Sequence, residues 1–154
     1  MSEFSWTLPY PSPAAAGDGR RDGSHLWGRD IWLDVAAANG PDRVVTASGD
    51  WLLAEGVEAY RQNLIRAFIT APGDWATKPT WGAGARLYVK RQNTRANRDE
   101  LVERLRAQAM RDRRTESVES IDVSWSNGTL RVHVVVIARG QIQRARRVEI
   151  SFEV

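Results

Sequence analysis

The sequence predicts an α+β fold, with a three-stranded antiparallel C-terminal meander, two main helices packed on one face of it, and an extended N-terminal arm. Three observations lead to this class. Apolar residues recur at helical spacing around residues 53–68 and again around 101–109. In the last third they alternate with polar residues, which is typical of half-buried strands. Asn127-Gly128 then predicts a two-residue hairpin turn, because both residues tolerate a positive φ.

Length and composition fit one globular domain. The chain has 154 residues, 22 basic and 19 acidic, with a net charge of +3, and only Lys78 and Lys90 are lysine. Arginines mixed with acids favour salt-bridged faces and protein interfaces over a phosphate-binding stripe. The absence of cysteine excludes disulfides, thiolate metal sites and a cysteine nucleophile. No secretory signal or membrane-length apolar run is visible, so we expect synthesis and use in the cytoplasm or in an assembly made there.

The first 27 residues differ in composition from the rest. Several prolines and glycines break any regular element there, with Trp6 and Tyr10 among them. Two interpretations stay open: a disordered tail, or an arm that docks on a neighbouring subunit through Trp6 and Tyr10. Residues 28–154 are expected to form a single wedge-like α+β domain.

Residues 28–38 alternate as a short strand, and residues 39–42 (NGPD) predict a turn. A helix is expected from Ser48 or Asp50, either of which can cap it, to the break at 72–73 (PG). Gly56 falls inside this predicted helix, where it is unfavourable by roughly 1 kcal/mol and suggests close packing of another element.

The loop that follows contains Trp75 and Trp81, large rings that stabilise only when packed, so it is expected to be an ordered joint. Residues 85–91 fit a short helix or a strand equally well. A second helix is predicted from a capping-box-like start at Asn97 and Glu100. Its buried stripe includes Leu101 and Leu105.

Three strands are predicted in the last third, at residues 121–126, 130–138 and 144–154. The middle strand is apolar on both faces, which suggests a central position with something covering each side. In the last strand, Val148, Ile150 and Phe152 point one way, and polar residues point the other.

No residue set predicts catalysis, a cofactor or a metal ion. His25 and His133 lie far apart in the sequence, and no nucleophile elbow is present. Asp50, Glu55, Glu58 and Asp74 are the acids weighed for a hydrolase, with Asp50 and Asp74 as the two to substitute, but the favourable helix dipole explains Asp50 without chemistry. Arg144, Arg146 and Arg147 are the best basic cluster for nucleic acid, although a charged strand face more often protects an edge.

Recognition of protein remains the best interpretation. An open sheet has edges that can accept a foreign strand through main-chain hydrogen bonds, and tryptophans can anchor an interface. The predicted partner-binding residues are Arg144, Arg146, Arg147, Val148, Ile150 and Phe152, together with Trp6 and Tyr10 in the arm.

Several segments resemble the baseplate wedge family of contractile-tailed phages and contractile injection systems, historically labelled lysozyme-like. They are 28–31 (GRDI), 62–66 (QNLIR), 69–74 (ITAPGD), Pro79 and 81–84 (WGAG). The most specific part is the helix that ends in Thr-x-Pro-Gly-acid, followed about ten residues later by aromatic-Gly. The family usually has Glu-Pro-Arg before the hairpin, whereas residues 114–118 here read RTESV, so no role is transferred to them.

The resemblance implies a structural baseplate component that links the wedge to the first sheath ring by packing and β-strand augmentation. Its implied partners are other wedge proteins and the contractile sheath protein, with tube or hub proteins as further candidates, in six copies per assembly. It implies no enzyme activity, cofactor, membrane or nucleic acid, and a place in the tail baseplate of a virion or injection particle assembled in the bacterial cytoplasm. Two alternatives stay open: a peptidoglycan hydrolase and a basic nucleic-acid-binding domain.

Overall fold

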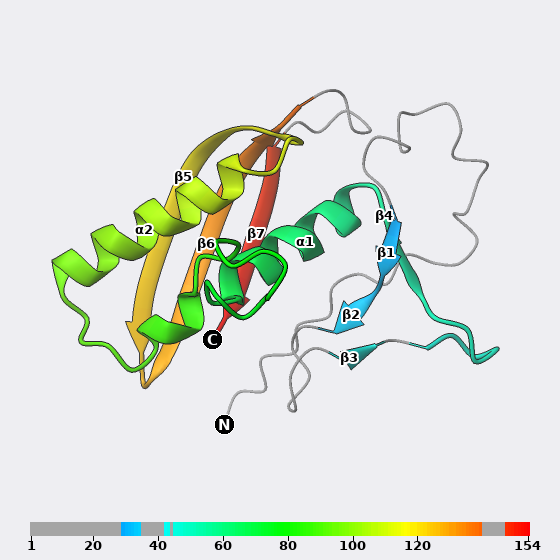
Figure 1. The fold of residues 1–154 in the computed structure, drawn as a ribbon, viewed down its shortest axis with the longest axis horizontal. Coiled ribbons are helices and arrows are strands. Elements are labelled where there is room, and N and C mark those ends of the chain that lie inside the picture. The colour runs from blue at the N-terminus through cyan, green and yellow to red at the C-terminus, as the bar shows by residue number, and fades with distance from the viewer. Residues whose placement is uncertain (1–28, 35–41, 44, 140–146) are drawn as a thin grey trace.

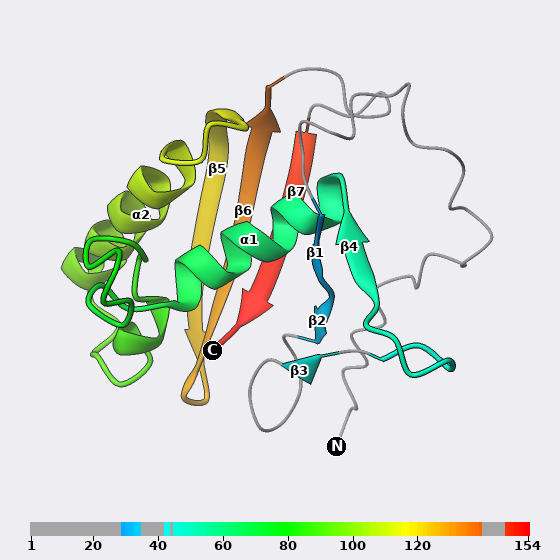
Figure 2. The ribbon, with the colours of Figure 1, turned by 45° about the vertical axis from the view of Figure 1, so that its right-hand side comes forward.

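The chain forms two layers, with two helices on one face of a three-stranded sheet (Figures 1 and 2). The computed structural model describes residues 29–34, 42–43, 45–139 and 147–154. The helices and the strands of this sheet are α1 (Val57–Ile69), α2 (Arg95–Met110), β5 (Thr115–Ser126), β6 (Thr129–Ala138) and β7 (Arg147–Glu153). The predicted α+β class, with both helices packed on one face of the meander, is therefore confirmed.

The sheet is antiparallel in the order β5-β6-β7, so β6 is central as predicted. Asn127 and Gly128 turn the chain with φ values of 49° and 80°, as the hairpin signal requires. The first strand begins at Thr115, earlier than predicted, and its pairing with β6 shifts register twice, between Thr115 and Ser117 and between Val118 and Ser120. These irregularities interrupt the alternation of apolar residues, and alternation was the signal on which the predicted boundary depended.

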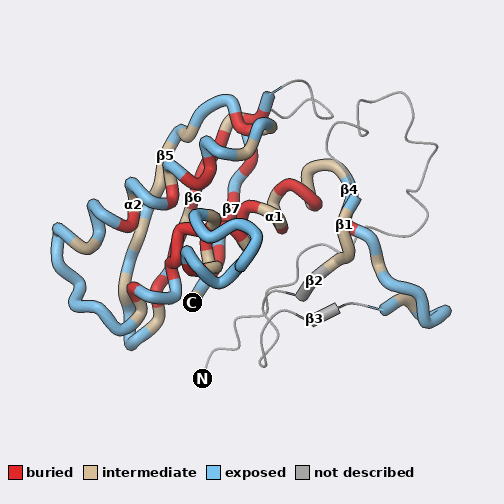
Figure 3. Tube along the Cα trace, viewed as in Figure 1, coloured by how far each residue is buried: buried red, intermediate tan, exposed pale blue. Residues whose placement is uncertain are grey.

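The core lies between the two layers, where Figure 3 shows the buried residues gathered. On β6 every second residue faces the helices, from Leu130 to Ala138, and each of these is at most 1% exposed. The rings of Phe68 in α1 and Phe152 in β7 stack with centroids 6.0 Å apart. Fully buried residues from the helices complete the core: Tyr60, Leu64, Leu101 and Leu105.

The opposite face of the sheet has no described helix or strand over it, so the expectation of a covering element on each side of β6 is wrong for the described residues. Val135 is nevertheless only 1% exposed on this face. It pairs with Ser120 and Glu149 across the two neighbouring strands. Cross-strand neighbours of this kind can bury a central valine without a second layer.

Two short strand pairs lie beside α1 at the N-terminal side of the described chain. They are antiparallel and pair β1 (Arg29–Ile31) with β4 (Leu53–Glu55), and β2 (Leu33–Asp34) with β3 (Asp42–Arg43). The strand predicted over residues 28–38 is thus confirmed for 29–31 and 33–34. Residues 35–38, and the predicted turn up to residue 41, lie outside the described residues.

Helix α1 begins at Val57, so the predicted start at Ser48 or Asp50 is wrong. Ser48 lies in a hairpin turn in which the Thr46 amide donates to the Asp50 carbonyl at 2.7 Å. Gly56 precedes the helix with a φ of 60°, and no atom lies within 4 Å of where its Cβ would be. The glycine therefore provides a positive φ at the strand-to-helix junction, and the close packing inferred for it is absent.

The N-cap of helix α2 lies three residues before the predicted cap, Asn97. The hydroxyl of Thr94 accepts a hydrogen bond from the Asn97 amide at 3.2 Å and is the N-cap. The undecided segment before it is a single turn of 3₁₀-helix, η3 (Ala85–Tyr88). Neither described helix has the combination of length and apolarity that spanning a bilayer requires.

Candidate protein-binding surfaces

The outer edge of β7 presents unpaired backbone groups. Leu130 and Val154 exchange both backbone hydrogen bonds at 2.9 Å. Because hydrogen-bonded pairs alternate along an antiparallel ladder, Phe152, Ile150 and Val148 also direct their N–H and C=O groups toward β6. The backbone groups of Glu149, Ser151 and Glu153 therefore point to the free edge, where no described strand pairs with them.

The other edge of the sheet, on β5, is less suited to strand addition. The two register shifts between Thr115 and Ser120 bend the strand, and bulges of this kind blunt an edge. Helix α2 also reaches its backbone, because Arg106 donates to the carbonyl of Val118 at 3.4 Å. In contrast, β7 pairs with β6 without a register shift from Arg147 to Glu153.

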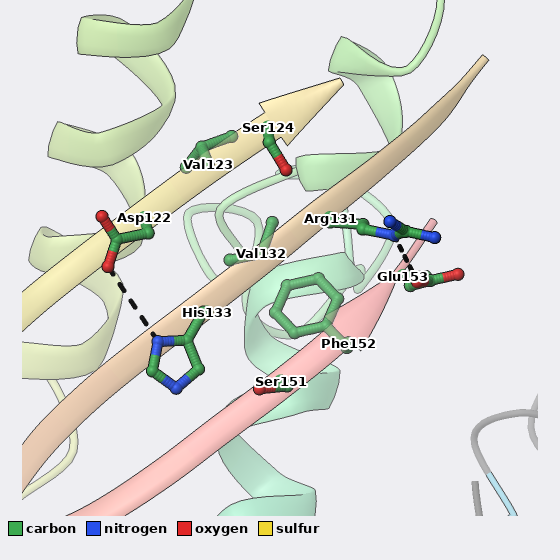
Figure 4. Close-up of a pocket in the computed structure, with 9 residues that line it drawn as sticks. All are labelled: Asp122, Val123, Ser124, Arg131, Val132, His133, Ser151, Phe152 and Glu153. Carbon is green, nitrogen blue, oxygen red and sulfur yellow. Dashed lines mark hydrogen bonds and ion pairs between the residues drawn. The ribbon is translucent and has the colours of Figure 1, made fainter. Parts of the chain in front are cut away.

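The open face of the sheet contains a shallow depression of about 480 Å³ (Figure 4). An arginine–glutamate ion pair and a histidine–aspartate pair flank it. Arg131 Nε lies 2.6 Å from Glu153 Oε1, and His133 Nδ1 lies 4.0 Å from Asp122 Oδ2. Figure 4 shows Arg131 turned toward Glu153 and His133 toward Asp122. The small side chains of Ser124 and Ser151 line the space between. The surface is polar and mixed in charge.

The loop from α1 to η3 forms a second surface. Its two rings, Trp75 and Trp81, stack with centroids 4.8 Å apart and planes inclined by 25°. The ammonium of Lys78 lies 5.8 Å from the centre of the Trp75 ring. Trp81 is half-buried, whereas Trp75 is 46% exposed, so the pair is ordered but not covered. The prediction of a packed joint is confirmed for Trp81 and only in part for Trp75.

Backbone hydrogen bonds fix this loop to both helices. The Ala83 amide donates to the carbonyl of Ala67 in α1 at 2.8 Å, and the Gly82 amide donates to Oε1 of Gln108 in α2 at 3.2 Å. Gly82 has a φ of 110°, and a Cβ atom there would collide with the backbone carbonyl of Thr70. Only glycine allows the loop to approach α1 this closely.

A polar junction joins both helices to the start of β5. Asp112 pairs with Arg114 at 2.6 Å and accepts a hydrogen bond from Asn63 of α1 at 3.0 Å. Burial alone would raise the pKa of the Asp112 carboxyl, but the hydrogen bonds and charge of Arg114, with the bond from Asn63, lower it overall. Beside it, the hydroxyls of Tyr60 and Thr115 are 2.6 Å apart, and burial raises the pKa of Tyr60 to about 12.

Residue 114, to which no role was transferred from the resemblance, has a structural role. The guanidinium of Arg114 lies 5.0 Å from the Tyr60 ring centre and pairs with Asp112. The carbonyl of Arg114 accepts the amide of Arg139 at 2.7 Å, which closes the β5–β6 end of the sheet. Sequence alone offered only the local Asp-x-Arg spacing as a signal, because the partners come from three separate segments.

The predicted partner-binding residues fall into three groups. Val148, Ile150 and Phe152 are at most 6% exposed, so their side chains hold β7 on the core. Arg147 is exposed and forms ion pairs with Glu119 at 3.0 Å and Glu149 at 2.7 Å. The remaining four lie outside the described residues: Arg144, Arg146, Trp6 and Tyr10. Partner binding by all eight stays a prediction.

Two of the acids considered for a hydrolase have local structural partners. Asp50 accepts a hydrogen bond from Ser48 at 3.3 Å in the hairpin turn, and Asp74 forms an ion pair with Arg86. Gly82 and Gly84, which follow Trp81 in the loop, make contacts through their backbone amides. Across the described ranges, no three histidine, cysteine or acidic residues group as ligands for a metal ion.

Comparison with known proteins agrees with this picture. A cryo-EM structure of the anti-feeding prophage baseplate, symmetrised six-fold, contains a chain with the same fold, at a TM-score of 0.56 and 18% identity. The match covers 75% of this chain and 89% of that one. Comparison with curated proteins gives no match. The model of the contractile injection system sheath initiator family matches residues 29–141, which is most of the described domain. The chain therefore belongs to the sheath initiator family of contractile injection systems.

Proposed function

We propose that this chain is a structural, non-catalytic component of the baseplate of a contractile injection particle, and that it starts the sheath by adding a strand of the sheath protein to β7. Family membership supports the baseplate role. The observation that carries the strand addition is the regular outer edge of β7, with the backbone groups of Glu149, Ser151 and Glu153 directed outward.

The core explains why β7 suits this task. Val148, Ile150 and Phe152 hold the strand against the helices, so its free edge is in place before a partner arrives. A preformed edge lowers the entropy lost on binding. On the open face, Arg147, Glu149 and Glu153 present charges of both signs beside that edge, and charges in such a position select a partner strand more than they add affinity.

The remaining contacts are proposed for the other parts of the chain. Arg144 and Arg146 precede β7 and add charge beside the same edge, whereas Trp6 and Tyr10 anchor the N-terminal arm on a neighbouring baseplate protein. We propose six copies around the axis, in contact with wedge proteins, the sheath and tube or hub proteins. The six-fold symmetrised baseplate that contains the structural match supports this number.

The experiment compares two substitutions at one residue. Ser151→Pro removes an N–H group that points to the free edge, and its ladder to β6 is unaffected because that amide does not bond to β6. Ser151→Ala keeps the N–H group and is the matched control. Each variant replaces the native chain in the particle-producing host, and sheathed particles are counted by electron microscopy. Removing residues 144–154 would be less informative, because it also removes three core residues.

We expect the proline variant to enter baseplates but to leave most particles without sheath, and the alanine variant to give normal particles. Thermal unfolding of both purified variants establishes that they are folded. Normal sheath on particles that contain folded Ser151→Pro protein would refute strand addition at β7. Release of fragments from peptidoglycan by the purified chain would refute the non-catalytic role.

A further inference from the structure

The strongest candidate for a second binding site, apart from the proposed strand addition, is the cleft beside the tryptophan loop. It encloses about 350 Å³ between the loop, the middle of α1 and the end of α2. Trp75 and Trp81 form one wall, and the cations Lys78, Arg111 and Arg113 surround it. We refer to this space, with these five residues, as the tryptophan cleft.

The aromatic wall has the properties of an anchor site. The Trp75 ring is stacked on Trp81 and yet 46% exposed, so a large apolar surface is held rigidly in solvent. Interface hot spots are enriched in tryptophan, and preorganised rings lose little entropy when a partner covers them. The loop that holds them is fixed to α1 and α2 through Ala83 and Gly82.

Within the described part of the chain, no carboxylate pairs with the three cations of the cleft. Among the described residues, no ion pair involves Lys78, Arg111 or Arg113, and Arg111 donates to the backbone carbonyl of Thr80. One acid, Asp112, lines the cleft, but it is committed to Arg114 and Asn63 and its side chain is only 11% exposed. The cleft therefore has a positive potential that a carboxylate from outside would complement.

The surroundings favour a peptide over nucleic acid. A nucleic-acid site needs a longer run of free cations along the phosphate backbone. Here the next arginines are already paired, Arg86 with Asp74 and Arg104 with Glu100. Three cations that have no ion pair with a described residue, beside one aromatic anchor, fit a few carboxylates that flank a bulky apolar side chain.

We propose that the tryptophan cleft binds an acidic peptide segment of another protein, which places an apolar side chain on Trp75 and its carboxylates on Lys78, Arg111 and Arg113. This inference does not rest on strand addition at β7, because the cleft lies on the helix side of the sheet and its residues come from other elements. It adds a second contact with a partner of defined chemistry.

The test measures binding of labelled peptides to the purified full chain by fluorescence anisotropy. The probe is the peptide EDEWLEDE with a tetramethylrhodamine label, and its matched control is QNQWLQNQ, which keeps size and apolar residues but has no charge. We expect the acidic peptide to bind at least about tenfold more tightly, with an affinity that weakens as salt is raised.

Variants locate the binding site. Trp75→Ala and Lys78→Glu should each weaken binding of the acidic peptide by about tenfold or more, as truncated anchors and reversed charges at an interface do. Trp51→Ala removes an equally exposed tryptophan elsewhere, and Lys90→Glu reverses the only other lysine, so both should bind as the native chain does. Ser151→Pro should also bind normally, which separates this test from the strand-addition test.

Several results would overturn the proposal. Equal affinity for the two peptides would remove the role of charge, and unchanged binding by folded Trp75→Ala would remove the cleft. No measurable binding of the acidic peptide at millimolar concentration would have the same meaning. Preferential binding of a short oligothymidylate, lost in Lys78→Glu, would assign the cleft to nucleic acid instead.

Discussion

The strand pairs of residues 29–55 and the helix–sheet unit of residues 57–154 are stabilised in different ways. The helix–sheet unit contains the whole described apolar cluster, from Tyr60 to Phe152. Among the residues of 29–55 whose side chains are described (29–32 and 45–55), Ala54 is the only buried one, and Val45, Trp51 and Leu53 are about half exposed. The strand pairs are tied to α1 mainly by polar contacts, which include the Asp30–Arg66 ion pair.

Because of this difference, the two regions need not unfold together. Burial of apolar area supplies most of the free energy of folding, so the helix–sheet unit should unfold as one cooperative body. A region held by half-exposed ion pairs and a few hydrogen bonds opens at lower free energy. Weakly held strand pairs beside a stable sheet would suit a component in which neighbouring proteins cover those strand pairs.

The largest expected effect on stability comes from removing an aromatic ring from the core. Phe68→Ala should lower the free energy of unfolding by about 3–5 kcal/mol, because Phe68 is fully buried and stacked on Phe152. Leu53→Ala, the matched change in the strand pairs, should lower it by less than about 0.5 kcal/mol, since Leu53 is 48% exposed. Urea unfolding followed by circular dichroism measures both. Equal losses would contradict the comparison.

An intermediate effect is expected at the polar junction inside the helix–sheet unit. Tyr60→Phe keeps the ring but leaves the Thr115 hydroxyl without its 2.6 Å partner, and should destabilise the protein by about 1–2 kcal/mol at neutral pH. Guanidinium unfolding at pH 7 gives this value.

The same variant predicts a pH dependence. Burial raises the pKa of Tyr60 from 10.0 to about 12, so the unfolded chain ionises first as the pH rises. The stability linked to Tyr60 is full below pH 10 and is lost between about pH 10 and 12, by roughly 2–3 kcal/mol. Because this loss exceeds the difference of about 1–2 kcal/mol expected at neutral pH, the stability advantage of the native chain over the variant should vanish and then reverse over that window. A constant difference across it would show that the hydroxyl is accessible to solvent.

A small effect on global stability, below that at the polar junction, is expected from Gln62→Ala. The buried Gln62 amide donates to the Ile31 carbonyl at 2.7 Å and ties β1 to α1. Global stability should fall by about 1 kcal/mol or less, while hydrogen exchange at the Trp32 amide, which bonds to Leu52, should speed up about fivefold. Amides of β6 should change only with global stability. Equal acceleration in both regions would show one cooperative unit.

The sequence predicted the meander well because its signals are local. The Asn127-Gly128 turn fixes the hairpin, and strict alternation fixes which residues of β7 face the core. Once the register is known, the same alternation shows which backbone groups point to the free edge. The full register itself depends on pairs of distant residues, such as Thr115 with Ala138 and Arg131 with Glu153, and on bulges in β5, which no local pattern contains.

Helix boundaries and the polar junction were less predictable for a different reason. Leu53 lies four residues before Val57, so a strand residue continues the helical spacing of α1 by coincidence, and the positive φ of Gly56 was needed to separate them. The junction of Asp112, Asn63 and Arg114 joins residues up to about 50 positions apart, so only the folded chain brings them together. The exposure of Trp75 likewise depends on how the loop is fastened.

The close approach of Gly82 to the backbone of Thr70 has a mechanical consequence. A loop that is held this closely against one end of α1, and bonded to Gln108 of α2, cannot extend without breaking these contacts. A load applied to Trp75 during contraction would pass directly into both helices and onward into the sheet beneath them. The loop would then act as a rigid connection between the two helices. Even one added methyl group at residue 82 would weaken its contacts with them.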